Sequence, residues 1–584
     1  MKRFIHHVGG VCLALCVFGM SFPTHAQVCK PKDTTVEQKQ AAVKYLRRLS
    51  LDLRGRLPSY AEQLKAYQDG HVTDATIDTM IKSGAFLTQM RGFFKDLLTL
   101  NITDLRLRGG SRVALYMYVN DKGDYVSGNT KNRTIVIDRA NTGTRVTMRG
   151  ANVGCLPNEK AKYNANGELL CKIRATGKYV TCLQAYNDRR AGKKNIAQEG
   201  YEMVVPYWDS NKKAVKTCGY AALKKAQPKV GTRTYYCSSS RSVHLGGSFS
   251  NLHCGCGPNL DWCLRAGEGR SGVKGMKGMN LELMEAMMEQ TLRFIDDVIK
   301  NDKSYTTLLT GKMAQVNGPL SHLFNKSAKA ANRLHMATPA ELKTPVIPYY
   351  NQSTWKSMNM GTRGAGILTL PFYTLKYATN RGRLHRYHNA FLCQFFSPPP
   401  GGLPDPTDTC HNQPDLTKRC GCKSCHQTIE PEAAHWGRWQ ENAWFPLNPT
   451  AFPKYDKKCD TSVTKSGNPG YCRTLYMLNP GHASEEKYKG KLLSYVFAPT
   501  AWDANIANGP TALVNRDIKN GKIASCGVKN MWQWFVGSDI QKQQAHVLSG
   551  LVSKFKGNNY NIRELVKAIV MSEEYRRGFE TEQP

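Results

Sequence analysis

The chain has 584 residues, of which 41% are hydrophobic and 22% charged, a composition typical of globular proteins rather than disordered or fibrous ones. Its 81 Lys and Arg residues against 45 Asp and Glu residues give a formal net charge of +36, which attracts nucleic acid, anionic membrane surfaces and acidic proteins alike. The length is sufficient for about three to four domains, each with its own core.

The first 26 residues are predicted to be a signal peptide. Lys2 and Arg3 precede an apolar run from Val8 to Phe22, and a cleavage site is expected after Ala26. We therefore expect a periplasmic or secreted protein. Exported chains rarely meet nucleic acid, so nucleic acid is not expected as a partner, whereas association with an anionic membrane surface is compatible with the charge. No later stretch reaches about 18 uninterrupted apolar residues, so no transmembrane span is expected.

Cysteine content agrees with export. Of 19 cysteines, two lie in the predicted signal peptide, and a density this high is typical of disulfide-bonded proteins outside the cytosol. Connectivity does not follow from one sequence. Close neighbours are nevertheless good candidates, because a short loop closes at small entropic cost, and we expect Cys410 to pair with Cys420 and Cys459 with Cys472.

Residues 27–105 are predicted to form a helical domain. Thr34 to Glu37 and Ser59 to Glu62 have the pattern of capping boxes that begin helices, and Gly70 is expected to end the second helix. A later helix has an apolar face typical of a buried core, comprising Phe86, Met90, Phe93, Phe94, Leu97 and Leu98.

Residues 106–270 are predicted to form a cysteine-rich insertion, β-rich or irregular. Strands are expected over 113–119 and 133–138, separated by turn residues. The cluster His253, Cys254, Cys256 and Cys263 has two interpretations, zinc ligands or disulfides. Disulfides are favoured in an exported chain.

Residues 271–402 are predicted to form a second helical domain that ends in a proline-rich linker. Asn280 is expected to cap a helix, and a further helical pattern covers 372–396 before Pro398, Pro399 and Pro400 stop it. The predicted buried face of the first helix consists of Leu281, Met284, Met288, Ile295 and Val298. Its methionines are interpreted as flexible core residues rather than copper or haem ligands.

Residues 403–584 contain Cys422-Lys423-Ser424-Cys425-His426, a Cys-x-x-Cys-His motif that is typical of covalent haem c attachment. Two thiols three positions apart can bond to the two vinyl groups of one porphyrin edge, and the adjacent histidine then becomes the proximal iron ligand. The alternative is that the two cysteines belong to disulfides or a zinc site. Cys420 also creates a longer Cys-x4-Cys-His frame with Cys425. Trp436, Trp439, Trp444 and Phe445 follow and are predicted to shield the haem from water.

The sixth iron ligand is predicted to be Met477. It lies 51 residues after His426, in a loop beside Pro480, as distal methionines do in small c-type cytochromes. The alternatives are His435, which is close in sequence to the attachment site, and His482 and Met531. The tail is predicted to be helical, with Met531 to Phe535, Ala545 to Phe555 and a last helix capped by Asn561 that carries Leu565, Ile569 and Val570.

Several segments together resemble one group of proteins. They are Leu46 to Pro58, the polyproline boundary, the haem motif with Ile429-Glu430-Pro431, and the closing Leu565 to Val570 with Ser572-Glu573 and Tyr575-Arg576. In the same order they are similar to large exported bacterial c-type cytochrome-like proteins with flanking domains of unknown function. The resemblance covers both ends of the chain, roughly half of it, and implies haem attachment at Cys422, Cys425 and His426. It implies no particular reaction.

Three function classes are therefore considered for a mainly α, multidomain protein with a C-terminal cytochrome-c-like domain. The favoured hypothesis is an electron-transfer cytochrome that docks to a redox protein partner. The basic net charge of the chain favours an acidic partner. The first alternative is a haem-dependent oxidoreductase or peroxidase with an open axial position. The second is a secreted binding scaffold with a structural haem. The sequence has no G-x-S-x-G, H-E-x-x-H or P-loop pattern.

Overall fold

The computed structural model describes residues 35–101, strands and turns within 117–137, 155–184 and 197–219, and, with short gaps, residues 279–324, 344–396 and 407–577. The predicted signal peptide, the cluster of Cys254, Cys256 and Cys263, and the proline-rich linker lie outside the described residues. The described part is mainly helical and contains strands between two helical regions, as the sequence predicts.

Four helices form the N-terminal region: α1 (Val36–Arg54), α2 (Tyr60–Asp69), α3 (Asp74–Lys82) and α4 (Gly84–Leu97). The capping box of Ser59 with Glu62 and the left-handed Gly70 (φ 70°) are confirmed. The first capping box lies one residue later than predicted, because Thr35 accepts from the backbone N–H of Gln38. Most of the predicted apolar face of α4 is buried, with Leu97 half-buried at the end of the helix.

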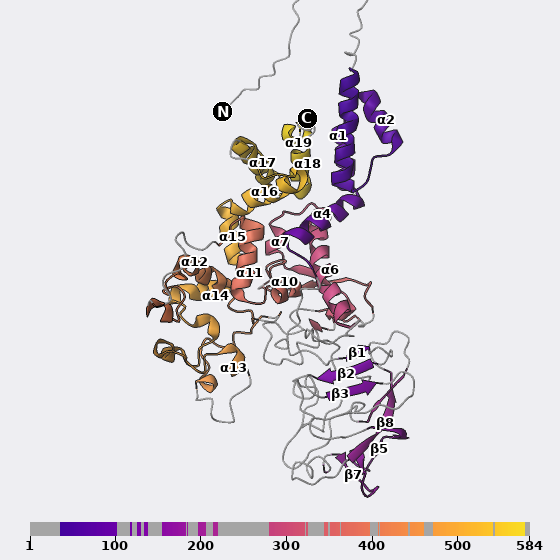
Figure 1. The fold of residues 1–584 in the computed structure, drawn as a ribbon, viewed down its shortest axis with the longest axis vertical. Helices are drawn as coiled ribbons and strands as arrows, with labels where there is room; N and C mark the ends of the chain where they lie inside the picture. The colour runs from indigo at the N-terminus through magenta and orange to yellow at the C-terminus, as the bar shows by residue number, and fades with distance from the viewer. Residues whose placement is uncertain are drawn as a thin grey trace, which may run out of the picture.

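The strands of the insertion form two sheets. The order β1-β2-β3 is antiparallel; the larger sheet has the order β4-β8-β6-β5, with β7 paired to β6 and β9 to β8. Figure 1 shows them gathered at the end of the molecule opposite the termini of the helical part. A Cys171–Cys182 disulfide joins β6 to the end of β7. The strands are β1 (Met117–Val119), β2 (Tyr125–Asn129), β3 (Arg133–Ile137), β4 (Cys155–Lys160), β5 (Lys162–Tyr163), β6 (Leu169–Ile173), β7 (Tyr179–Thr181), β8 (Ala197–Val204) and β9 (Val215–Cys218).

The central helix α6 (Met279–Lys300) differs from its prediction in two details. Asn280 lies within the helix instead of capping it, and Met287 is fully buried while Met288 is half-buried. In the first half of the helix the buried residues are therefore Leu283 and Met287, while the predicted Met284 and Met288 pack at the edge of a core. Ile295 and Val298 are buried, as expected. After α6 come α7 (Thr307–Thr310), β10 (Met313–Val316) and β11 (Lys356–Asn359), the last two paired antiparallel.

The predicted helix over 372–396 is broken into three pieces: α10 (Pro371–Lys376), α11 (Asn380–Tyr387) and a π-helix, η4 (His388–Leu392). The break is stabilised by Arg383, which is fully buried. Its guanidinium donates to the carbonyls of Thr374 (3.0 Å) and Tyr377 (3.1 Å), which the interrupted helix leaves without helical partners. Burial lowers the pKa of Arg383 to about 10.

The motif region of the C-terminal part contains α12 (Lys423–Ala433) and the short 3-10 helix η6 (Ala434–Trp436). Its tail is helical as predicted: the side chain of Asn561 caps α18, and the predicted apolar residues of α16 and α18 are buried. The remaining helices are η5 (Thr409–Asn412), η7 (Lys457–Cys459), α13 (Cys472–Leu475), η8 (Ala483–Tyr488), η9 (Leu493–Tyr495), η10 (Thr500–Trp502), α14 (Asp503–Asn508), α15 (Pro510–Lys519), α16 (Lys522–Val536), α17 (Ala545–Gly557), α18 (Ile562–Val570) and α19 (Glu573–Arg577).

One hydrophobic core extends from the first helix to the last. It contains buried residues of α1, α4, α6, α11, α12, α16 and α18. The yellow C-terminal helices lie near indigo α1 (Figure 1), where Tyr45 donates to the carbonyl of Val570 (2.9 Å) and Tyr575 donates to Asp52 (2.6 Å). A Cys393–Cys526 disulfide joins the end of η4 to α16. The predicted domain boundaries stay predictions; the described helices on both sides of residue 402 share this core.

Candidate functional site

The Cys-x-x-Cys-His motif forms the start of α12. Gly421 precedes it in the left-handed conformation (φ 72°), and the carbonyl of Cys422 accepts from the backbone N–H groups of Cys425 (3.2 Å) and His426 (3.0 Å). Both cysteines and the histidine are half-buried. One helical turn therefore carries two sulfur atoms and an imidazole, the donor set that covalent haem attachment needs.

Cys420, two residues before the motif, forms a disulfide outside it. Cys420 is in a disulfide with Cys410, with Cα atoms 5.5 Å apart, and Cys422 is outside any disulfide among the described residues. This pairing and that of Cys459 with Cys472 (Cα atoms 5.3 Å apart) are the two predicted local disulfides, and both are confirmed. The longer frame that uses Cys420 is wrong for this structure, because its first thiol is consumed by the bond to Cys410.

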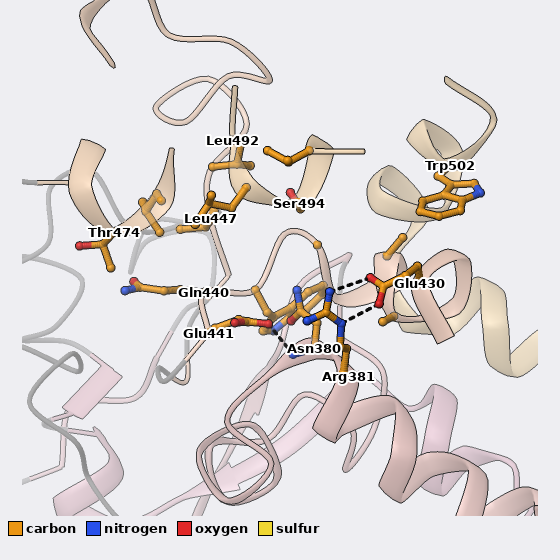
Figure 2. A pocket seen from close by; sticks show the side chains of 17 residues that line it. Asn380, Arg381, Glu430, Gln440, Glu441, Leu447, Thr474, Leu492, Ser494 and Trp502 are labelled. Carbon is orange, nitrogen blue, oxygen red and sulfur yellow. Dashed lines mark hydrogen bonds and ion pairs between the residues drawn. The ribbon is translucent and has the colours of Figure 1, made fainter. Parts of the chain in front are cut away.

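The imidazole of His426 is oriented by a carboxylate one turn further along α12. Its Nδ1 lies 2.5 Å from Oε1 of Glu430, so Nδ1–H donates and Nε2 is the nitrogen left for a metal. Arg381 of α11 holds the same carboxylate with two bonds, Nε to Oε1 (2.7 Å) and Nη2 to Oε2 (3.2 Å). Figure 2 shows the guanidinium of Arg381 turned toward Glu430. The residues of the motif thus fit a haem attached at the two thiols and ligated by His426.

A second carboxylate fixes the other side of α12. Glu432 accepts from Nε2 of buried His388 in η4 (2.5 Å) and pairs with Arg516 of α15 (2.8 Å). Burial by itself would raise the pKa of Glu432, but His388 and Arg516 outweigh it, so the pKa of Glu432 is lowered. Arg516 also pairs with Asp517, which accepts from Tyr387 (2.9 Å). The helix that bears the motif is therefore held to η4 by a buried hydrogen bond and to α15 by a partly exposed ion pair.

The predicted aromatic residues after the motif have different surroundings. Trp436 is fully buried in the main core, and Trp444 is buried in a second core beside Phe324. Only Trp439, among the described members of this group, lines the cavity next to α12. Phe445 lies outside the described residues. Two of the tryptophans are thus already covered by protein in the two cores, and shielding of a haem stays a prediction.

That cavity has a volume of about 360 Å³, within the size range of ligand pockets in proteins. One wall comes from α12 and the segment after it, including Glu430, Ala433 and Gly437. Figure 2 shows Leu447, Leu492 and Ser494 on the other side of it from Arg381 and Asn380. The remaining lining residues are Ala434, Trp439, Gln440, Glu441, Thr474, Leu475, Leu493, Val496 and Trp502.

Met477 follows Thr474 and Leu475, which line the cavity on the side opposite α12. It is half-buried, its N–H donates to the carbonyl of Lys491 and its carbonyl accepts from Gly490 (both 2.9 Å). Leu475, two residues earlier, lines the cavity. Neither Met477 nor His426 is itself a lining residue of the cavity, so the structure brings their segments to one cavity without bringing the two side chains together.

The three alternative ligands are engaged in other contacts. Met531 is fully buried in the main core. His482 caps η8 through a bond from the N–H of Ser484 (3.1 Å). Nδ1 of His435 bonds the carbonyl of Gly509 (2.9 Å), and burial lowers the pKa of that imidazole.

The sequence indicates the motif but not its partners Glu430, Arg381 and Glu432. The spacing of His426 and Glu430, four residues apart within one helix, was a usable signal, since such pairs face each other. The contacts to α11, η4 and α15 join residues distant in sequence, and no local pattern indicates them.

Comparison with known proteins found no matching family model, no similar curated protein and no similar solved structure. Within the described part of the chain, no helix is both long enough and apolar enough to cross a lipid bilayer.

Proposed function

We propose that this protein is an exported c-type cytochrome with one covalently bound haem, and that it transfers electrons in the periplasm or at the cell surface. The observation that carries the proposal is the partition of cysteines at α12. Cys420 is bonded to Cys410, whereas Cys422 is outside any described disulfide, on the same turn as Cys425 and His426. A purely disulfide-bonded loop has no need of a histidine oriented in this way.

Each residue of the motif has a defined role in this proposal. Cys422 and Cys425 form thioether bonds to the two vinyl groups, which fixes one porphyrin edge. His426 binds the iron through Nε2 while Nδ1–H stays on Glu430. A haem bound in this way supplies one-electron chemistry. The C-terminal region is, on this proposal, a cytochrome-c-like domain, in keeping with the resemblance seen in the sequence.

The sixth ligand decides between the two main function classes. Met477 is proposed for an electron-transfer cytochrome, because its segment forms the cavity wall across from α12. The cavity itself is the observation that favours the alternative, a haem-dependent oxidoreductase or peroxidase, since an open axial position needs space beside it for a small substrate.

The surroundings support docking to a redox protein in an exported setting. Four disulfides are present among the described residues, which is typical of proteins outside the cytosol. One haem cannot relay charge over a long distance, so the protein must receive and pass electrons by contact with a partner. The net charge of +36 favours an acidic partner and makes the association rate sensitive to salt.

The test is absorption spectroscopy of the full-length protein matured in a periplasm that attaches haem c. We expect a c-type pyridine haemochrome that survives acid-acetone extraction. Cys422→Ser should remove one thioether, detected by mass spectrometry of the haem peptide, while Cys420→Ser should retain both. A protein without haem, or a thioether at Cys420, would contradict the proposal.

A second measurement addresses the axial ligand. If Met477 binds the iron, the oxidised protein shows a weak thioether-to-iron band near the red edge of the visible spectrum, and Met477→Ala abolishes it and admits carbon monoxide. Met531→Ala serves as the control, because that methionine is fully buried in the core. Carbon monoxide binding and peroxide turnover by the unsubstituted protein would favour the oxidoreductase.

A further inference from the structure

Glu430 makes an unusual set of contacts for a helix surface residue. Its Oε1 accepts from two donors, Nδ1 of His426 (2.5 Å) and Nε of Arg381 (2.7 Å), and its Oε2 accepts from Nη2 of Arg381 (3.2 Å). The side chain of Glu430 is 19% exposed. Its charge is thus shared between an imidazole and a guanidinium, at the wall of the cavity.

A carboxylate on Nδ1–H has two effects on a ligating histidine. It fixes the ring orientation and the tautomer, and it makes the other ring nitrogen a stronger electron donor. A stronger donor stabilises ferric over ferrous iron and so lowers the reduction potential. A backbone carbonyl in the same place orients the ring but carries no full charge.

Arg381 acts on the same carboxylate in the opposite sense. Its guanidinium comes from a different helix, α11, and binds with a two-pronged geometry that holds the carboxylate in place. By neutralising part of the negative charge of Glu430, it limits how strongly the carboxylate draws on the proton at Nδ1. Arg381 and Glu430 therefore form a pair whose two members have opposite effects on His426.

We infer that Glu430 and Arg381 are positioning residues that set the reduction potential of an iron bound at Nε2 of His426, Glu430 lowering it and Arg381 raising it. The inference rests on the proposed haem attachment and adds to it the regulation of that site. It concerns how the two side chains change the relative stability of ferric and ferrous iron. It requires no particular sixth ligand.

The experiment is a redox titration of the haem-loaded full-length protein and three variants. Glu430→Gln should raise the potential by about 59 mV, which for a one-electron couple is a tenfold change in the ratio of reduced to oxidised protein. Arg381→Gln should lower it. The matched control is Glu441→Gln, which removes the same charge from the same cavity wall, where Glu441 accepts from the N–H of Asn380 (2.9 Å) and not from His426.

Resonance Raman spectroscopy of the ferrous protein with an open sixth position, whichever side chain has to be removed to open it, supplies a readout that a structural role would not move. The iron-histidine stretch should fall to lower frequency in Glu430→Gln and rise in Arg381→Gln. If Glu430→Gln fails to load haem while Glu441→Gln loads normally, Arg381→Gln supplies the test of sign: a potential below that of the unsubstituted protein supports the inference, and a higher one overturns it.

The outcomes are distinguishable from failure of the proposed function. Absence of haem from the unsubstituted protein overturns the cytochrome itself. A loaded protein in which Glu430→Gln shifts the potential no further than Glu441→Gln, or in which both Glu430 and Arg381 variants shift it in the same direction, overturns the inference and leaves the cytochrome in place.

Discussion

Replacing Trp436 with alanine should destabilise the whole helical part of the molecule. Trp436 ends η6, which continues directly from α12, and its side chain is fully buried. Its indole N–H donates to the carbonyl of Leu368 (3.3 Å), and its ring lies 6.4 Å from that of Tyr387. The substitution therefore removes a large core side chain and a buried hydrogen bond at the point where the motif helix meets the core.

The expected magnitude follows from these two losses. Truncating a buried tryptophan to alanine costs about 3 to 5 kcal/mol in unfolding free energy, and the abandoned Leu368 carbonyl adds about 1 kcal/mol. Domains have total stabilities of about 5 to 15 kcal/mol, so this one change removes a large fraction. Trp436→Phe keeps most of the volume and loses the hydrogen bond, and about 1 to 2 kcal/mol is expected.

Urea unfolding followed by far-ultraviolet circular dichroism measures the change. The matched control is Trp534→Ala, because the side chain of Trp534 is 37% exposed and contacts Phe93 at its edge. That variant should lose about 1 kcal/mol. Equal losses for Trp436→Ala and Trp534→Ala would refute the argument that α12 is anchored through Trp436.

Two further predictions concern stability. Removing the Cys393–Cys526 disulfide, which closes a loop of 133 residues, should lower the free energy of unfolding by about 5 kcal/mol. Removing Cys410–Cys420, which closes a loop of 10, should lower it by about 3 kcal/mol. Denaturation of the two double alanine variants measures both losses, and the reverse order would contradict the loop-entropy argument. Arg54 lowers the pKa of Glu62 from 4.5 to about 2, so the stability from this pair is present above pH 4.5 and is lost as the pH falls toward 2. The free energies of unfolding of the unsubstituted protein and Glu62→Gln should therefore converge as the pH falls toward 2. A difference between them that does not change with pH would contradict the assignment.

Local patterns predicted most of the helices correctly. Capping by Ser59 and Asn561 depends on residues two or three positions apart, and such signals are complete within the sequence. The helix over 372–396 was wrong because its break depends on Arg383, whose guanidinium bonds the carbonyls of Thr374 and Tyr377 and also that of Gln440 (3.0 Å). A contact 57 residues away is invisible to helical periodicity.

At the candidate site, too, local features could be predicted from the sequence and tertiary contacts could not. The motif itself and the local pairing of Cys410 with Cys420 follow from spacing, because short loops close easily. The burial of Trp436 in the main core could not be predicted, since an aromatic residue near a motif has the same sequence signature whether it shields a cofactor or fills the core. Partners such as Arg381 come from a helix some 50 residues away, and only the tertiary structure places them.

The geometry of α12 limits where a sixth ligand can come from. Residues 430, 433, 434 and 437 line the cavity and lie on one face of the helix and its continuation, and His426 precedes Glu430 on this face by one turn. If a haem held by His426 extended into this cavity, a second ligand would come from the opposing wall, which is built from Thr474, Leu475 and Leu492 and their neighbours. Met477 lies two residues after Leu475 without lining the cavity itself, and its half-buried side chain is not part of the main core, as that of Met531 is. The same wall would have to move closer for Met477 to bind iron. We therefore expect haem attachment to contract the cavity in an electron-transfer cytochrome and to leave it open in an oxidoreductase.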